Sequence, residues 1–179
     1  MNLKLLAVAI LLPLAGCGYR QVGSATHVPA DVRTVSVPIF QSKVQAYNSE
    51  TAFTEAVVRE LNTRTRYRVL TNVNASTPAT DQGSDATLRG TILTQAITPL
   101  TYDASSGQTS SYLVTITADV ALVGHDGTVL YRNSAFAWRE QYQSTQDLSG
   151  FVQEDSAAVR RMARDFAQAL VSDMMESFR

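Results

Sequence analysis

The sequence contains little cysteine, little histidine and almost no net charge. Its 179 residues include 1 cysteine and 2 histidines. A single cysteine excludes an intramolecular disulfide framework and a cysteine-rich metal site. His27 and His125 lie far apart in the chain, so a zinc site would need carboxylates from elsewhere. With 15 Lys and Arg against 16 Asp and Glu, the formal net charge is −1, which excludes a strongly basic nucleic-acid-binding surface. The chain is 45% hydrophobic and long enough for one domain with a buried core.

The sequence also lacks the usual catalytic signatures. It contains no Gly-x-Ser-x-Gly elbow, phosphate loop, dinucleotide fingerprint or His-Glu-x-x-His pair. His125 is the obvious candidate base, but its Gly-His-Asp-Gly context is typical of a solvated hairpin turn. Asp81 and Asp85 lie in a polar stretch, where we favour turn chemistry over a metal or carboxylate-pair role. We therefore predict a protein that is not an enzyme, with no catalytic residue, no metal site and no cofactor.

Only one apolar run stands out, and it is short. Leu5–Leu14 spans about 10 residues, whereas a membrane-spanning helix needs roughly 20. Lys4 precedes the run and small residues follow it, which is the layout of an export signal.

The run ends in Leu14-Ala15-Gly16-Cys17, which is typical of the lipobox of bacterial lipoproteins. The small residues admit a peptidase, and the Cys17 thiol is the nucleophile that takes a diacylglycerol. We predict cleavage after residue 16, leaving Cys17 as the first residue with N-palmitoyl and S-diacylglycerol groups that hold the protein on a membrane. The alternative is a plain secretory signal with an incidental cysteine. Gly18 stands where an Asp retains enterobacterial lipoproteins at the inner membrane, so we predict the outer membrane.

The remaining chain shows the periodicities of a β-α-β-β-β-α domain. The predicted elements are a strand over 32–39, a helix from Asn48 or Ser49 to Arg64, strands over 67–70, 86–98, 112–122 and 128–142, and a helix over 152–174. Polar residues at 41–43 end the first strand, residues 99–110 form a hairpin tip, and 124–127 form a tight turn.

The simplest fold for these elements is an α+β sandwich of the broad α/β class. Its mixed sheet carries both helices on one face, because this arrangement buries both apolar helix stripes. We divide the chain into a cleaved signal peptide (1–16), an acylated tether (17–30) and one domain (31–179).

The basic residues are almost all arginine. Lysine occurs only at Lys4 and Lys43. Arginine binds phosphates through two parallel hydrogen bonds, so Arg64, Arg66 and Arg68 are candidates for a patch that binds an anionic lipid. We favour the alternative, a helix end followed by a solvated strand face.

Three of the aromatic residues on the last predicted strand lie close together in its second half. Phe136, Trp138 and Tyr142 are compatible with a lipid-contacting face. Packing in the core or against a partner is at least as consistent with the sequence, because aromatic residues favour strands in general.

Several segments together resemble one known family. They are Cys17-Gly18-Tyr19-Arg20, Thr34–Phe40, Phe53–Leu61, Asp85–Ile92, and Gly107–Tyr112 leading into Val114–Ala118. In order and spacing they resemble the LPS-assembly lipoprotein family (LptE), a component of the outer-membrane lipopolysaccharide translocon. The resemblance covers nearly all of the mature chain.

The resemblance implies a non-enzymatic plug. Such a lipoprotein sits inside the large β-barrel LptD, helps it assemble, and assists the delivery of lipopolysaccharide to the cell surface. At the hairpin tip it points to Tyr102, Ser105 and Gln108 as partner-contacting residues.

The sequence departs from the family in two loops where relatives carry basic residues. Residues 99–110 contain one charged side chain, Asp103, and residues 143–152 contain one, Asp147. We therefore do not assign direct lipopolysaccharide binding to either loop.

Two other functions compete with the plug. One is a periplasm-facing lipoprotein that activates a peptidoglycan synthase. Such activators cross the periplasm on a long tether, whereas the dozen or so residues after Cys17 reach at most roughly 40 Å, which favours a partner in the same membrane. The other is a lipid-carrying enzyme or metal protein, for which the sequence offers no site residues.

Overall fold

The computed structural model describes residues 31–44, 49–71, 83–102, 104, 109–143 and 157–178. Its elements are β1 (Thr34–Ser36), β2 (Gln41–Ser42), α2 (Ser49–Arg64), β3 (Arg68–Leu70), β4 (Ala86–Tyr102), β5 (Thr109–Gly124), β6 (Val129–Gln143) and α3 (Ala157–Ser177). Without the short strand β2, the observed order is β-α-β-β-β-β-α. Each predicted strand and helix is present, and the abbreviation β-α-β-β-β-α counts one strand too few. The predicted signal peptide, the tether with Cys17, and the tip residues Ser105 and Gln108 lie outside the described residues.

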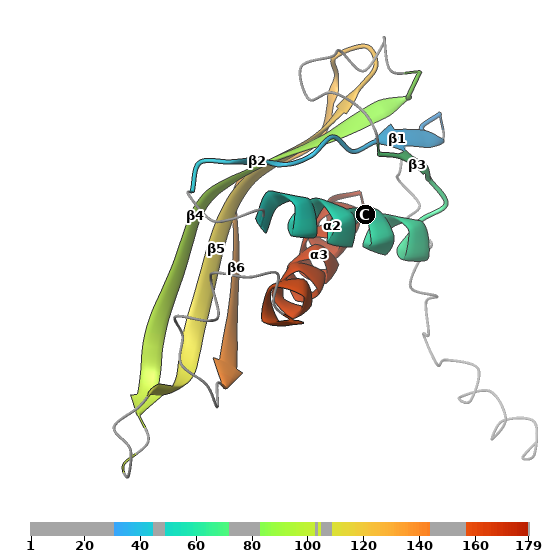
Figure 1. Cartoon of the computed structure of the whole chain (residues 1–179). Helices are drawn as coiled ribbons and strands as arrows, with labels where there is room; N and C mark the ends of the chain where they lie inside the picture. Colours follow the sequence, from blue (N-terminus) through green and yellow to red (C-terminus); the bar gives the residue numbers. More distant parts are fainter. Residues whose placement is uncertain are drawn as a thin grey trace, which may run out of the picture.

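The strands form one mixed sheet of 6 strands. Its order is β3-β1-β4-β5-β6, and β2 pairs separately with β4. Strand β1 runs parallel to β3 and β4, whereas the β4–β5 and β5–β6 pairs are antiparallel. Both α2 and α3 lie on the same side of this sheet (Figure 1), which confirms the predicted arrangement.

The core lies between the helices and the inner face of the sheet. Alternate residues of β5, including Val114, Ile116 and Ala118, are fully buried, as their period-2 pattern predicts. Phe166 of α3 packs against Phe53 of α2, with ring centroids 4.9 Å apart. The same ring contacts β6.

The β6 aromatic residues belong to this core. Phe136, Trp138 and Tyr142 are 7%, 6% and 8% exposed. The rings of Phe136 and Trp138 lie edge-to-face on Phe166, at centroid distances of 5.4 and 6.3 Å. The structure therefore favours core packing over a lipid-contacting face for these side chains.

The first strand ends earlier than predicted, at Ser36, and two of the polar residues that were expected to follow it form a strand of their own. Gln41 and Ser42 form β2, which pairs in parallel with Thr91 and Ile92 of β4. The preceding Phe40 is 2% exposed and lies directly over Gly90, where a Cβ would come within 2.5 Å of its ring. Phe40 thus holds the polar segment 41–42 against β4, and the backbone of this segment hydrogen-bonds to β4 as an additional strand.

The hairpin tip is also shorter than predicted. Strand β4 continues through Pro99, which pairs with Tyr112, to Tyr102. Beyond Ile92, β5 is the only neighbour of β4 among the described residues. Proline is tolerated on such an edge because its missing N–H group deprives no neighbouring strand of a hydrogen bond. The register shifts directly after Pro99.

Two predicted turn residues have backbone roles. His125 lies exposed in the β5–β6 turn, where Gly127 has a φ of 85°. Asp85 accepts hydrogen bonds from the backbone N–H groups of Arg33 and Thr34 at 2.8 and 2.7 Å. These bonds hold the pKa of Asp85 below its usual value. Asp85 thereby fixes the start of β1 beside β4, while Asp81 lies outside the described residues.

Candidate functional site

The long part of the sheet extends well beyond the short strands. Strand β1 pairs with β4 only at Ala86 and Thr87, and β2 only at Thr91 and Ile92. From there, β4, β5 and β6 continue together as a curved three-stranded extension (Figure 1). Its concave side faces the helices, and no described element covers its other side.

The middle of the uncovered side carries mainly small, uncharged side chains, which we call the threonine face. Its members are paired across the strands and alternate with the buried residues of β5. They are Thr94, Ala96, Thr98, Thr115, Thr117 and Ala137. Thr94 donates a hydrogen bond to Thr117 across the β4–β5 pair at 2.9 Å. This surface is rich in hydroxyl groups, and Leu113 and Arg139 lie on the same side, opposite Thr98 and Thr115.

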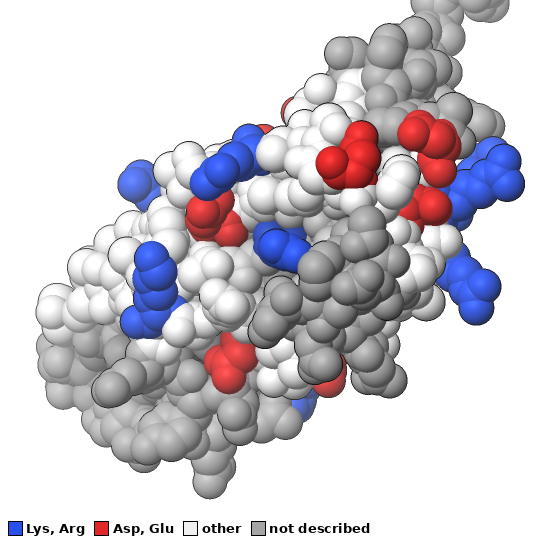
Figure 2. Space-filling model, turned by 90° about the horizontal axis from the view of Figure 1, so that it is seen from above, with Lys and Arg blue, Asp and Glu red and all other residues white. Residues whose placement is uncertain are grey.

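Charged residues lie at the margins of the threonine face. Arg139 pairs with Thr115 on the edge strand β6. At one end, Arg132 and Asp119 form an ion pair at 3.5 Å. Seen from above the molecule, basic and acidic side chains are interspersed, and no large area has one sign (Figure 2).

The far end of the hairpin exposes apolar side chains. Leu100 is 44% exposed and Tyr102 is 64% exposed. Between them, the Thr101 hydroxyl lies 2.6 Å from the Ser111 hydroxyl across the pair, with register shifts on both sides of Thr101. The exposure of Tyr102 suits a partner contact, and its role stays a prediction.

Two buried tyrosines of β6 attach the sheet to α3. The Tyr131 hydroxyl donates to Asp173 at 2.6 Å, and the Tyr142 hydroxyl donates to Asp165 at 3.3 Å. Burial, together with these carboxylates, raises the pKa of both phenols well above the usual range. Both tyrosines therefore stay protonated, and their bonds hold β6 against the helix.

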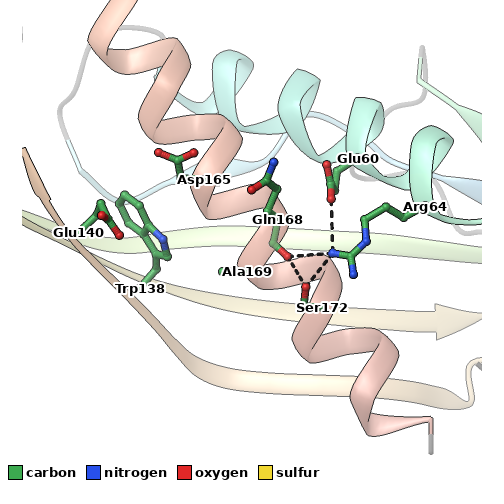
Figure 3. A pocket seen from close by; sticks show the side chains of 8 residues that line it. All are labelled: Glu60, Arg64, Trp138, Glu140, Asp165, Gln168, Ala169 and Ser172. Atoms are coloured by element: carbon green, nitrogen blue, oxygen red, sulfur yellow. Dashed lines mark hydrogen bonds and ion pairs between the residues drawn. The ribbon is translucent and has the colours of Figure 1, made fainter. Parts of the chain in front are cut away.

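The structure separates the three predicted arginines. Arg64 donates to Ser172 at 2.7 Å and to the Gln168 carbonyl at 3.4 Å, and pairs with Glu60 at 3.4 Å (Figure 3). Its guanidinium group therefore joins α2 to α3. Arg66 and Arg68 are exposed, so a lipopolysaccharide-binding role, still a prediction, is better suited to these two than to Arg64.

Sequence reasoning missed a cleft beside Arg64. It lies between α2, α3 and β6, has a volume of about 610 Å³, and is lined by Glu60, Arg64, Trp138, Glu140, Asp165 and Gln168 among others (Figure 3). We call it the inter-helix cleft. The spacing of Asp165, Gln168 and Ser172 along α3 was a signal for a polar stripe. Its partners on β6 were not visible in the sequence.

Two further searches concern the described residues only. None of their His, Cys, Asp and Glu residues form a group of three that could hold a metal ion. No helix among them is both long and apolar enough to cross a membrane.

The described residues thus form a two-layer α+β domain in which the helices cover one face of the sheet and no described element covers the other. The sequence pattern of the lipopolysaccharide-assembly family LptE matches residues 32–174. The chain therefore belongs to this family, and the resemblance seen in the sequence is confirmed.

Solved structures with a similar chain path have low sequence identity. The hypothetical protein CT253 from Chlamydia trachomatis is 12% identical, with a TM-score of 0.54 over 82% of this chain and 98% of that one. It shares the fold. Lipoprotein GNA1162 from Neisseria meningitidis is 14% identical, with a TM-score of 0.48 over 80% of this chain and 99% of that one. Rare lipoprotein B from Shewanella oneidensis is also 14% identical, with a TM-score of 0.46 over 81% and 96%. No curated protein sequence matches the chain.

Proposed function

We propose that this protein is an outer-membrane lipoprotein that plugs an LptD-type β-barrel, helps it assemble, and assists lipopolysaccharide transport to the cell surface. In this proposal residues 31–179 form the single plug domain. Cys17 carries the lipid, and residues 17–30 tether the domain at the same membrane. The role is non-enzymatic and needs no cofactor.

The threonine face is the observation that carries this proposal, together with membership of the family. The inner wall of a large β-barrel is polar. Small threonine and alanine side chains allow close approach to such a wall, and the threonine hydroxyl groups both donate and accept hydrogen bonds. Because the members of this face are small and not strongly apolar, it would also stay hydrated before assembly.

The hairpin end supports a second contact with the barrel. Leu100 and Tyr102 project apolar surface beyond the helix layer, and a partner would bury it. The exposed side chains of Arg66 and Arg68 would bind lipopolysaccharide, since guanidinium groups form paired hydrogen bonds with phosphate groups. The alternative role as activator of a peptidoglycan synthase is not favoured by the family match.

Photo-crosslinking in cells tests the barrel contact. A photoreactive residue replacing Thr117 or Tyr102 should capture a large outer-membrane β-barrel, identified by mass spectrometry. His125, exposed in the turn at the other end of β5, is the matched control and should capture less of it. Capture of the barrel from His125 but from neither test position would contradict the assignment of this face.

Lipid attachment needs its own experiment. Wild-type protein should incorporate labelled palmitate and fractionate with the outer membrane. Cys17→Ser should lose both the label and the membrane association, because no other cysteine is present. Labelled and processed Cys17→Ser protein would show that the lipobox interpretation is wrong.

A further inference from the structure

The three-stranded extension has two lateral edges, one formed by β4 and the other by β6 (Figure 1). Strand β2 covers the edge of β4 only as far as Ile92, whose carbonyl accepts the backbone N–H of Lys43 at 2.9 Å. On that side of the next segment, 94–100, no strand is paired within the described part of the chain. The backbone groups that face this edge are therefore open to another strand.

The edge of β6 carries features that discourage pairing with another strand. Arg132, Arg139 and Glu140 are exposed along it, and a register shift interrupts the strand. Charged side chains and bulges are the usual protection of edge strands. The segment 94–100 of β4, in contrast, contains no charged residue. Of the two edges, that of β4 is the one suited to take up another strand.

Pro99 indicates which backbone groups face the edge of β4. It pairs with Tyr112 of β5, and proline is accepted within a strand where its missing N–H would face an open edge. Successive residues of a strand direct their backbone groups to opposite sides. Because no register shift lies between Thr94 and Pro99, the N–H and C=O groups of Gln95 and Ile97 face the same edge as Pro99.

This segment is complementary to a second copy of itself in antiparallel orientation. The facing pairs about a twofold axis at Ile97, all of them uncharged, are Ile97–Ile97, Ala96–Thr98, Gln95–Pro99 and Thr94–Leu100. Leu100, which is 44% exposed in the single chain, gains an apolar contact in this arrangement. Strand β2 of each copy stays clear of the pair, because β2 extends no further along β4 than Ile92.

We propose that two copies of the free protein pair through the β4 edge, in antiparallel orientation about Ile97. The N–H group of Ile97 in each copy donates to the Ile97 carbonyl of the other, and the Gln95 N–H donates to the Pro99 carbonyl. The two extensions then form one continuous sheet, and the twofold contact closes on itself. Pairing also covers an uncharged edge that a lone chain would expose to aggregation.

The pairing goes beyond the proposed barrel contact and is tested separately from it. It uses the backbone edge of β4, whereas barrel capture is tested from side-chain positions 102 and 117. Failure to capture a barrel would leave the pairing standing. A protein that never pairs would leave the barrel contact standing.

Cysteine crosslinking in cells tests the pairing. Two differently tagged copies of the full chain, one with Ala96→Cys and one with Thr98→Cys, are co-expressed and oxidised with copper phenanthroline. Both positions are exposed. In an antiparallel pair, facing residues that exchange no hydrogen bonds have Cα atoms about 4.5 Å apart, which is within the range of a disulfide. We therefore expect a disulfide-linked dimer that carries both tags.

Two controls accompany the crosslinking. Ala137→Cys in both copies places an exposed cysteine on the same side of the sheet but on β6, and it should give little dimer. The unsubstituted chain, whose one cysteine is Cys17, measures the background.

Ile97→Pro tests the backbone hydrogen bonds. It removes the N–H groups at the centre of the pair, and the fold should tolerate it because Pro99 already occupies an equivalent position on this edge. Sedimentation equilibrium of the purified full chain in density-matched detergent should show a reversible monomer–dimer equilibrium. Ile97→Pro should weaken the dimer by about thirtyfold, the effect of losing two hydrogen bonds, whereas Ile97→Val should retain it. Circular dichroism verifies that each variant is folded.

Three results would overturn the proposal. The first is a wild-type chain that stays monomeric up to about 1 mM. The second is as much disulfide-linked dimer from the Ala137→Cys copies as from the mixed Ala96→Cys and Thr98→Cys copies. The third is wild-type dimerisation by folded Ile97→Pro protein.

Discussion

The contact between Gly90 and Phe40 leads to a sharp stability prediction. The Phe40 ring lies over Gly90 of β4, and a Cβ built on Gly90 would lie 2.5, 2.6 and 2.7 Å from three of its ring carbons. Carbon atoms in contact normally lie about 3.5–4.0 Å apart. Because Phe40 is only 2% exposed, its ring has little room to move away. Gly90→Ala should therefore force the segment that leads into β2 off the sheet.

The expected cost follows from overpacking of a core. Such substitutions destabilise by about 1–3 kcal/mol, and we expect Gly90→Ala to lie in the upper half of this range. The displaced ring also endangers the Phe40 N–H bond to the Thr54 hydroxyl, now 2.9 Å long. Phe40→Leu shortens the side chain and should cost about 1–2 kcal/mol alone. In the double variant the clash is relieved, so the two effects should not add.

Urea unfolding followed by the fluorescence of Trp138 measures these free energies. Gly83→Ala is the matched control, because a Cβ there meets nothing within 4 Å and only its φ of 65° opposes the substitution. Its cost should be smaller, about 1 kcal/mol. The reasoning is refuted if Gly90→Ala changes the unfolding free energy by less than about 0.5 kcal/mol, or if Gly90→Ala and Phe40→Leu prove additive.

Three further predictions concern the core, the threonine face and pH. Phe166→Ala, at a fully buried ring, should lower the unfolding free energy in urea by about 3–5 kcal/mol. Val129→Ala, at a side chain that is 53% exposed, should change it by less than about 0.5 kcal/mol. Similar losses in the two variants would contradict the placement of Phe166 in the core. Thr117→Lys should abolish co-purification of the barrel without altering the melting temperature. Glu55→Lys, at an exposed position of α2, should leave co-purification intact. If the Thr117→Lys protein still co-purifies with the barrel, the threonine face is not the barrel contact. Burial raises the pKa of Tyr67 from 10.0 to about 12, so the folded chain keeps a proton that the unfolded chain loses first. The unfolding free energy should fall between pH 10 and 12 and fall less in Tyr67→Phe, and an equal fall in both would exclude this phenol as a cause.

Elements with a strong hydrophobic period were predictable, because a period of 2 or of 3.6 residues places the apolar side chains on one face of a strand or a helix. The alternation along β5 identified its buried face, and the apolar stripe from Met162 to Met174 identified that of α3. The polar strand β2 has no such pattern. It exists because Phe40 finds room over Gly90, and this contact joins segments about 50 residues apart that local sequence does not relate.

The candidate site residues also divide into those whose placement the sequence predicted and those that only the structure placed. The exposure of Tyr102 agrees with its expected place at the hairpin end. Arg64, in contrast, was grouped with Arg66 and Arg68 by proximity in the chain, whereas its guanidinium group reaches Gln168 and Ser172 on the other helix. Arg64 is the last residue of α2, Arg66 follows the helix and Arg68 begins β3, so the three side chains leave the backbone in different local structures.

The sequence by itself predicts an export signal with a lipobox pattern, and it determined the order of the main elements and the buried side of each. Composition and repeat length carry this information, since local geometry and hydrophobicity act over a few residues. Only the tertiary structure decided which side of the sheet stays bare, that the β6 aromatic side chains enter the core, and that Trp138 shares a cleft with Asp165. Those outcomes depend on contacts between α2, α3 and β6, and such contacts arise only when distant segments pack together.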